Sequence, residues 1–239
     1  MQPAAAAHRL PLLQGPIGML SADAIVALHD QRTQDWHLSP GEANCAGAEA
    51  GSSSPAKNEA GGEAAADWLA VVARQHRANF DLWHIEDEAR APGATDAEIA
   101  AVKRRVDLTN QRRGDLAEEL DRALLAWLAT RNLPSPAAEL NSESPGLIVD
   151  RLSILALKIY HTREETERGD APAGHAERNR ERLAILEEQR ADLTGCLDAL
   201  WRQTLAGTRR FKLYRQLKMY NDPSLNPAIY RKNRMESSR

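Results

Sequence analysis

The chain has 239 residues, and 31 lysines and arginines against 34 acidic residues give it a formal net charge of −3. This balance argues against a globally basic nucleic-acid binder. No continuous apolar run reaches the roughly 18 residues of a membrane span, and two cysteines in unrelated contexts supply neither a disulfide nor a zinc framework. These observations predict a soluble, cytoplasmic protein of one or two domains without a membrane span.

The charge is distributed unevenly along the chain. Residues 202–239 contain ten basic and two acidic side chains, so the preceding residues carry the excess of acids. A basic end on an acidic body indicates either docking of that end on the body or binding of an external anion. Because the acidic body would repel a long polyanion, a small phosphorylated ligand fits this pattern better than nucleic acid does.

The first part of the chain contains one short helix between two segments of low complexity. Residues 1–20 are predicted to be a loose extension, 21–38 a first helix, and 39–66 a flexible insertion. Between positions 39 and 67 there is no Val, Ile, Leu, Met, Phe, Trp or Tyr. Such a composition cannot bury enough apolar surface to offset the entropy lost on ordering.

The main domain is predicted at 67–230, followed by a basic tail at 231–239. We predict helices for its segments, because the sequence contains no alternating runs of β-branched residues from which strands could form. Thr95 and Glu98 have the spacing of a capping box, and Pro145 suits a first helical turn. The expected helices span about 63–90, 95–131, 144–168, 174–206 and, as a short final element, 209–220. Long helices with short connections predict an all-α fold, an elongated antiparallel bundle of about five main helices plus a short C-terminal helix.

Several polar side chains fall on apolar helix faces when residues are placed at about 100° per position. Arg113 lies in the centre of one such face with Asn110 beside it, and Glu86 lies within another. The helix at about 144–168 is apolar nearly all round, which is typical of the buried centre of a bundle. Its charged residues form one narrow stripe: Asp150, Arg151, Lys158, His161 and Glu165.

A buried arginine needs a carboxylate partner, so Arg113 and Arg190 are expected to form ion pairs. The candidate partners are Glu86, Asp87, Asp150 and Glu165. Two interpretations stay open at this point. The polar residues form either an interhelical ion-pair network that fixes the helix register or a polar ligand pocket in the bundle core.

Five segments have distinctive sequences: WHIED at 83–87, KRRVD at 103–107, NSESPG at 141–146, DRLSILALKIYH at 150–161 and YRQLKMYNDP at 214–223. They resemble a bacterial family known as domain of unknown function 4254. The resemblance extends over most of 21–230 apart from the insertion. It implies that the polar positions belong to a family pattern, and it assigns no activity to them.

A metal-dependent reaction is one alternative. Glu86 and Asp87, followed by Glu118 and Asp121 on the next helix, are similar to the carboxylates of helical nucleotide pyrophosphohydrolases. Arg90 stands where a third acid is needed, and a cation there opposes a Mg²⁺ site. No Glu-x-x-His pair of the di-iron type is present either. We therefore assign no metal ligands from the sequence.

The preferred function is that of a binding module for a small anionic ligand, such as a nucleotide or sugar phosphate. The candidate ligand-binding residues are Glu86, Asp87, Asn110, Arg113, Asp150, Arg151, Lys158, His161, Arg215 and Lys218. One alternative is a metal-dependent hydrolase or transferase that uses core carboxylates. The other is a structural or interaction protein with an ion-pair network in its core, able to form homo-oligomers. Neither enzymatic activity nor a cofactor is assigned by the sequence.

Overall fold

The computed structural model describes residues 20–38, 60–218, 222 and 224–227, with the side chains of 60–66 left aside. The predicted N-terminal extension up to residue 19, most of the predicted insertion and the basic tail lie outside the described residues, whereas Leu20 is buried in the core. The described part contains five helices and two short strands. In chain order these are α1 (Ala22–Leu38), α2 (Ala60–Glu88), α3 (Asp96–Ala129), β1 (Glu139–Leu140), α4 (Pro145–Glu167), α5 (His175–Leu205) and β2 (Arg209–Arg210).

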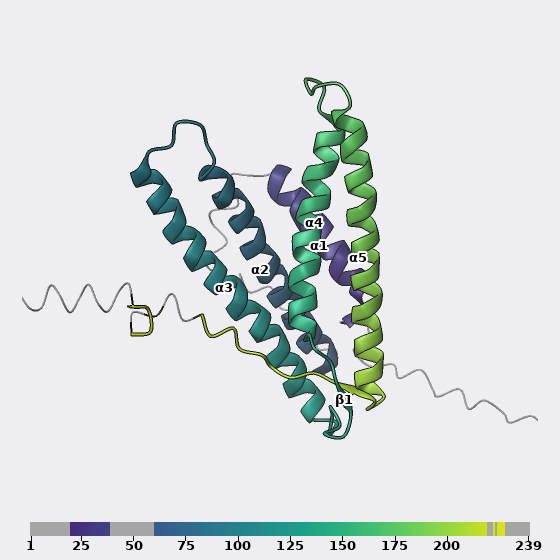
Figure 1. Ribbon diagram of the computed structural model, residues 1–239. Helices are drawn as coiled ribbons and strands as arrows, with labels where there is room; N and C mark the ends of the chain where they lie inside the picture. Colours follow the sequence, from purple (N-terminus) through teal and green to yellow (C-terminus); the bar gives the residue numbers. More distant parts are fainter. Residues whose placement is uncertain (1–19, 39–59, 219–221, 223, 228–239) are drawn as a thin grey trace, which may run out of the picture.

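The helices form two antiparallel hairpins, α2–α3 and α4–α5, with α1 packed across them (Figure 1). α4 contacts each of the other four helices, and nearly every side of it is buried. The predicted all-α bundle with this helix at its centre is therefore confirmed. Within the described residues, no helix is long and apolar enough to cross a membrane.

One large apolar cluster holds the five helices together. It includes Trp68 from α2, Leu124 from α3, Leu152 from α4 and Trp201 from α5, all nearly inaccessible to solvent. The start of α3 is fixed by the predicted capping box, because the Thr95 side chain accepts from the backbone N–H of Glu98 while the Glu98 carboxylate accepts from that of Thr95. These features fix the relative positions of α2, α3 and α4, which carry the candidate site.

The start of α4 approaches α3 so closely that only glycine fits. A Cβ atom added to Gly146 would lie 2.3 Å from the backbone oxygen of Ala117. We expect Gly146→Ala to lower the free energy of unfolding by about 1–3 kcal/mol, as measured by urea titration, because the two helices must separate. Gly195→Ala in α5 is the control. An added Cβ meets nothing within 4 Å there, so the better helix former should stabilise by about 0.5–1 kcal/mol.

The prediction of a short helix at 209–220 is wrong for residues 209–218, the part of that range that the structure describes. β2 pairs in parallel with β1, and Asn141 N donates to Arg210 O at 2.7 Å. Residues 211–218, the C-terminal strap, then continue without helical structure and cross α3 (Figure 1). Phe211 is buried to 1% exposure and anchors the strap, so pairing with β1 and burial of this ring outweigh local helix propensity.

Candidate functional site

Asp150 of α4 is the centre of a buried polar network. Its carboxylate is within hydrogen-bond distance of three donors, which are the amides of Gln75 and Asn79 on α2 and the guanidinium of Arg113 on α3. The arginine pairs with it through two nitrogens, Nε at 2.8 Å and Nη2 at 2.7 Å. The predicted carboxylate partner of Arg113 is therefore confirmed, and it is Asp150.

The network continues from Asp150 toward α1. Asn79 Nδ2 donates to Ser153 Oγ at 2.9 Å, and the same hydroxyl lies 2.7 Å from Nδ1 of His76. His76 Nε2 lies 2.9 Å from Thr33 Oγ1, and the ring stacks on His29 with centroids 4.5 Å apart. Four helix faces that look apolar by periodicity thus meet through hydroxyl, amide and imidazole groups.

Both network histidines are neutral imidazoles at neutral pH. Burial lowers the pKa of His76 from 6.5 to about 3. Burial, followed by the neighbouring His76, also holds the pKa of His29 well below its usual range. A charged imidazolium at either position would lie in the apolar interior without a carboxylate in contact with it.

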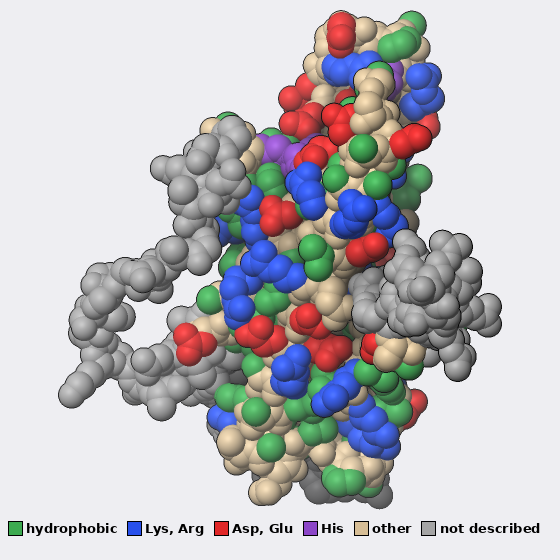
Figure 2. All heavy atoms as spheres, turned by 90° about the vertical axis from the view of Figure 1, so that its left-hand side faces the viewer, with side chains coloured by type: hydrophobic (Ala, Val, Ile, Leu, Met, Phe, Trp, Pro, Cys, Tyr) green, Lys and Arg blue, Asp and Glu red, His purple; other side chains and the backbone are tan. Residues whose placement is uncertain are grey.

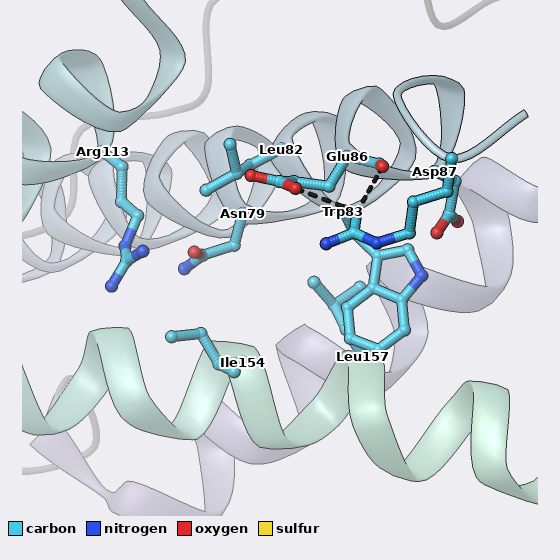
Figure 3. A pocket seen from close by; sticks show the side chains of 9 residues that line it. Asn79, Leu82, Trp83, Glu86, Asp87, Arg113, Ile154 and Leu157 are labelled. Carbon is cyan, nitrogen blue, oxygen red and sulfur yellow. Dashed lines mark hydrogen bonds and ion pairs between the residues drawn. The ribbon is translucent and has the colours of Figure 1, made fainter. Parts of the chain in front are cut away.

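A pocket of about 320 Å³ adjoins this network between α2, α3 and α4 (Figure 3). Its lining residues are Asn79, Leu82, Trp83, Glu86, Asp87, Arg90, Arg113, Ile154 and Leu157. Arg113 belongs to both features, since one edge of its guanidinium is bound to Asp150 while the side chain also forms part of the pocket wall. Its side chain is 28% exposed, against 10% for that of Asp150. Arg113 therefore connects the buried network with solvent.

The two ends of the pocket differ in charge. Arg90 pairs with Glu86 of its own helix, Nη1 to Oε2 at 2.9 Å. At the Arg113 end, a second cation arrives from the C-terminal strap, because Lys218 Nζ donates to the backbone oxygen of Asn110. Burial, and next the nearby Arg113 cation, lower the pKa of Lys218. Two cations thus lie close together near Asp150, while Asp115 and Asp107 also act on the Lys218 side.

The structure brings six of the predicted site residues together and leaves four elsewhere. Glu86, Asp87 and Arg113 line the pocket, and Asn110, Asp150 and Lys218 surround Arg113. The other four are distributed as follows: Arg151 pairs with Glu143, Lys158 is exposed on α4, Arg215 is exposed on the strap, and His161 stacks on Trp83.

Arg190 shows where the sequence-based pairing is wrong. It binds Asp30 of α1, with both carboxylate oxygens 2.9 Å from Nη1, and none of the four acids proposed for it. The faces of α1 and α5 that meet in the fold carry this pair. Sequence periodicity identified the polar position on α5 but not the neighbouring helix it would face.

Sequence reasoning also missed His76, Ser153 and Thr33. A usable signal existed, because Gln75 and Asn79 are one turn apart on α2, and Asp150 and Ser153 are one turn apart on α4. As for metals, Asp150 is bound by Arg113 and Glu86 by Arg90. Across the described ranges, the one group of three side chains placed to hold a metal ion is His37, His84 and His161.

Comparison with known protein families decides the classification. Residues 69–213 match the family described as "Protein of unknown function (DUF4254)". The chain belongs to the DUF4254 family. The match spans most of α2 and continues to the beginning of the strap, so it includes Asp150, Arg113 and every residue of the pocket wall. No curated protein and no solved structure is significantly similar to this DUF4254 chain.

Proposed function

We propose that this DUF4254 protein binds a small anionic ligand, such as a nucleotide or a sugar phosphate, in the pocket between α2, α3 and α4. The observation that carries the proposal is the guanidinium of Arg113 in the pocket wall, oriented by Asp150 and accompanied by Lys218. A planar guanidinium recognises phosphate and carboxylate groups through paired hydrogen bonds. Because Asp150 already fixes its orientation, little further side-chain entropy is lost on binding.

The remainder of the pocket supports a ligand with an apolar or planar part. Leu82, Ile154 and Leu157 supply aliphatic contacts, and Trp83 supplies an aromatic one (Figure 3). A volume of about 320 Å³ lies at the small end of the range for ligand sites in proteins. Asn79 adds a polar group to the wall. This combination suits a small phosphorylated or carboxylated metabolite better than a bare inorganic ion.

The electrostatics also favour an anion. Burial is the main cause of the lowered pKa of Lys218, and repulsion by Arg113 adds to it, whereas Asp115, Asp150 and Asp107 act in the opposite direction. A negative group bound next to both cations would remove this repulsion and restore the charged form of the lysine. Binding of the ligand is therefore expected to be coupled to proton uptake by Lys218 at alkaline pH.

The two alternative functions receive less support from the contacts. A hydrolase or transferase that uses Glu86, Asp87 and Asp150 on a metal ion would first have to separate two of these carboxylates from arginines. The ion-pair network of the structural alternative is present around Asp150, and it coexists with the pocket. Arg113 and Asn79 take part in both features, so a role in helix register and a role in binding are compatible.

The experiment compares two lysines of the C-terminal strap. Lys218→Gln removes the cation next to Arg113, whereas Lys212→Gln removes an exposed lysine from the same segment. We expect a nucleotide or hexose phosphate to raise the melting temperature of the native chain. Lys218→Gln should weaken its affinity by roughly 10–100-fold, the effect of losing one charge-assisted hydrogen bond, and Lys212→Gln should not change it. Calorimetric titration measures these affinities.

Two results would contradict the proposal. One is that no phosphorylated compound in a screen of nucleotides, sugar phosphates and inorganic phosphate stabilises the chain. The other is equal affinity in the two lysine variants, which would place the bound anion away from Arg113.

A further inference from the structure

Three histidines from three helices meet next to the pocket, on the other side of Trp83. His37 lies in the last turn of α1, His84 in α2 and His161 in α4, where its ring stacks on Trp83 with centroids 4.8 Å apart. Each offers one ring nitrogen, and these nitrogens all lie within 4.8 Å of one another. The side chains are half-buried, and histidine atoms reach the surface next to apolar side chains in the upper half of Figure 2.

Each of the three rings uses Nδ1 for a contact within its own helix. His37 Nδ1 donates to the backbone oxygen of Thr33 at 2.7 Å, and His84 Nδ1 donates to that of Phe80 at 2.9 Å. Since a carbonyl can only accept, both rings carry their proton on Nδ1 when neutral, and Nε2 has a free lone pair. His161 Nδ1 lies 2.8 Å from Oε2 of Glu164, so its Nε2 is the remaining nitrogen as well.

Two of the three Nε2 atoms have no hydrogen-bond partner in the described part of the chain. Those of His37 and His161 are buried and lack a hydrogen-bond partner. An unsatisfied buried polar atom costs about 1–3 kcal/mol, so a purely aromatic cluster would be a costly arrangement. Aromatic contacts hold two of the rings in place. Tyr160 stacks on His37 with ring centroids 4.3 Å apart, and Trp83 stacks on His161.

We propose that His37, His84 and His161 bind a zinc ion through their three Nε2 atoms, with a fourth coordination position left open. Metal-binding histidines commonly donate their other ring N–H to a carbonyl or a carboxylate, which is the arrangement found for all three. Three imidazoles without a carboxylate ligand select zinc and related first-row metals over Mg²⁺ and Ca²⁺. The proposal does not depend on the anion pocket.

The rings must move closer together to reach coordination geometry. Nitrogens at about 2.0–2.1 Å from a tetrahedral zinc ion are roughly 3.4 Å apart. The ligand nitrogens now lie within 4.8 Å of one another, so we expect metal binding to draw the three rings inward by rotation about χ1 and χ2. Three protein ligands and one open position are typical of zinc sites that bind water or a substrate atom.

The test is a titration of the full, untagged chain with ZnCl₂ by calorimetry, repeated with Co²⁺ to record the visible absorption of a tetrahedral cobalt centre. We expect one metal ion per chain. His161→Gln should weaken binding by at least about 100-fold, since loss of a partner of the ligands already costs 10–100-fold. His175→Gln is the control, because this histidine also contacts a glutamate, with Nε2 2.7 Å from Glu165, but lies outside the cluster of three. The His175→Gln variant should bind zinc with the affinity of the native chain.

Two neighbouring carboxylates provide a second comparison. Glu164→Ala should weaken zinc binding by about 10–100-fold because it removes the partner of the His161 ring. Glu165→Ala should leave it unchanged. His84→Gln repeats the test at another ligand, and circular dichroism verifies the helical fold of each variant.

The proposal would be overturned if the folded native chain gave neither heat nor a cobalt spectrum at millimolar metal. It would equally be overturned if His161→Gln and His84→Gln bound zinc as tightly as the native chain. The Lys218→Gln variant should retain full zinc affinity, so failure of the anion proposal and failure of the metal proposal can be distinguished.

Discussion

Lowering the pH from about 7.5 to about 4.5 is expected to reduce the free energy of unfolding, by about 3 kcal/mol through His76 alone, because two buried histidines stay neutral in the folded chain. The pKa of His76 falls from 6.5 to about 3 on folding, and that of His29 is also well below its usual value. Below pH 6.5 the unfolded chain therefore binds protons that the folded chain excludes. Each such histidine lowers the stability by about 1.4 kcal/mol per pH unit.

One carboxyl group acts in the opposite direction. Burial raises the pKa of Asp121 from 3.8 to about 6, so between these values the folded chain binds a proton that the unfolded chain releases. Between about pH 6 and about pH 4 this proton offsets the one that His76 excludes, so the remaining loss of stability in that range comes from His29. Above about pH 6 both histidines act without this compensation.

Urea titrations at a series of pH values measure the effect, and two variants should change the slope in opposite directions. His76→Gln removes one excluded proton and should make the pH dependence shallower by about 1.4 kcal/mol per unit. Asp121→Asn removes the compensating group and should make it steeper. An unchanged slope in His76→Gln would show that this histidine is protonated in the folded chain.

Asp150→Ala is expected to destabilise the chain by about 3–5 kcal/mol. The substitution leaves the Arg113 cation without its partner and removes the acceptor of Gln75 and Asn79, all in a region where Asp150 itself is 7% exposed. Asp150→Asn should have a smaller effect because it keeps an oxygen acceptor. The free energy of unfolding by urea at neutral pH is the measurement.

The matched control is Glu119→Ala, which breaks an exposed ion pair with Arg74 between α2 and α3, the two helices that the network joins to α4. The side chains of Arg74 and Glu119 are well exposed, 52% and 40%, so the loss of unfolding free energy should stay below about 1 kcal/mol. Equal losses in Asp150→Ala and Glu119→Ala would contradict the role of Asp150 as the centre of the network. By the same reasoning Arg113→Leu destabilises the fold, so Lys218 is the better position at which to test binding.

Helix positions and the buried centre could be predicted from the sequence, because hydrophobic period and end signals are local properties. Thr95 and Glu98 mark the start of α3, and the nearly all-apolar α4 lies where its composition requires. The pairing of Arg113 with Asp150 followed from the cost of an unpaired buried cation. In each case the interaction that determines the structure acts within one helix or between two oppositely charged groups.

The remaining features depend on which helix faces which, and periodicity does not contain that information. His37, His84 and His161 are far apart in the sequence, and each alone is an ordinary interface histidine. Arg190 finds Asp30 because α1 packs across α5, an arrangement that no local signal in the chain encodes. The helix prediction for the C-terminal strap was wrong because strand pairing with β1 and burial of Phe211 override helix propensity over so short a segment.

The strap supplies part of the proposed anion site from outside the helix bundle. It crosses α3 at Gly114, where an added Cβ would lie 2.8 Å from Oε1 of Gln216, and its backbone is held there by the Glu118 carboxylate. Lys218 therefore reaches Arg113 only in molecules whose strap is seated, so the affinity for the proposed anion should scale with that fraction. Cleavage within the strap, or an antibody that holds it away, should weaken the proposed site without altering a single residue of the pocket wall.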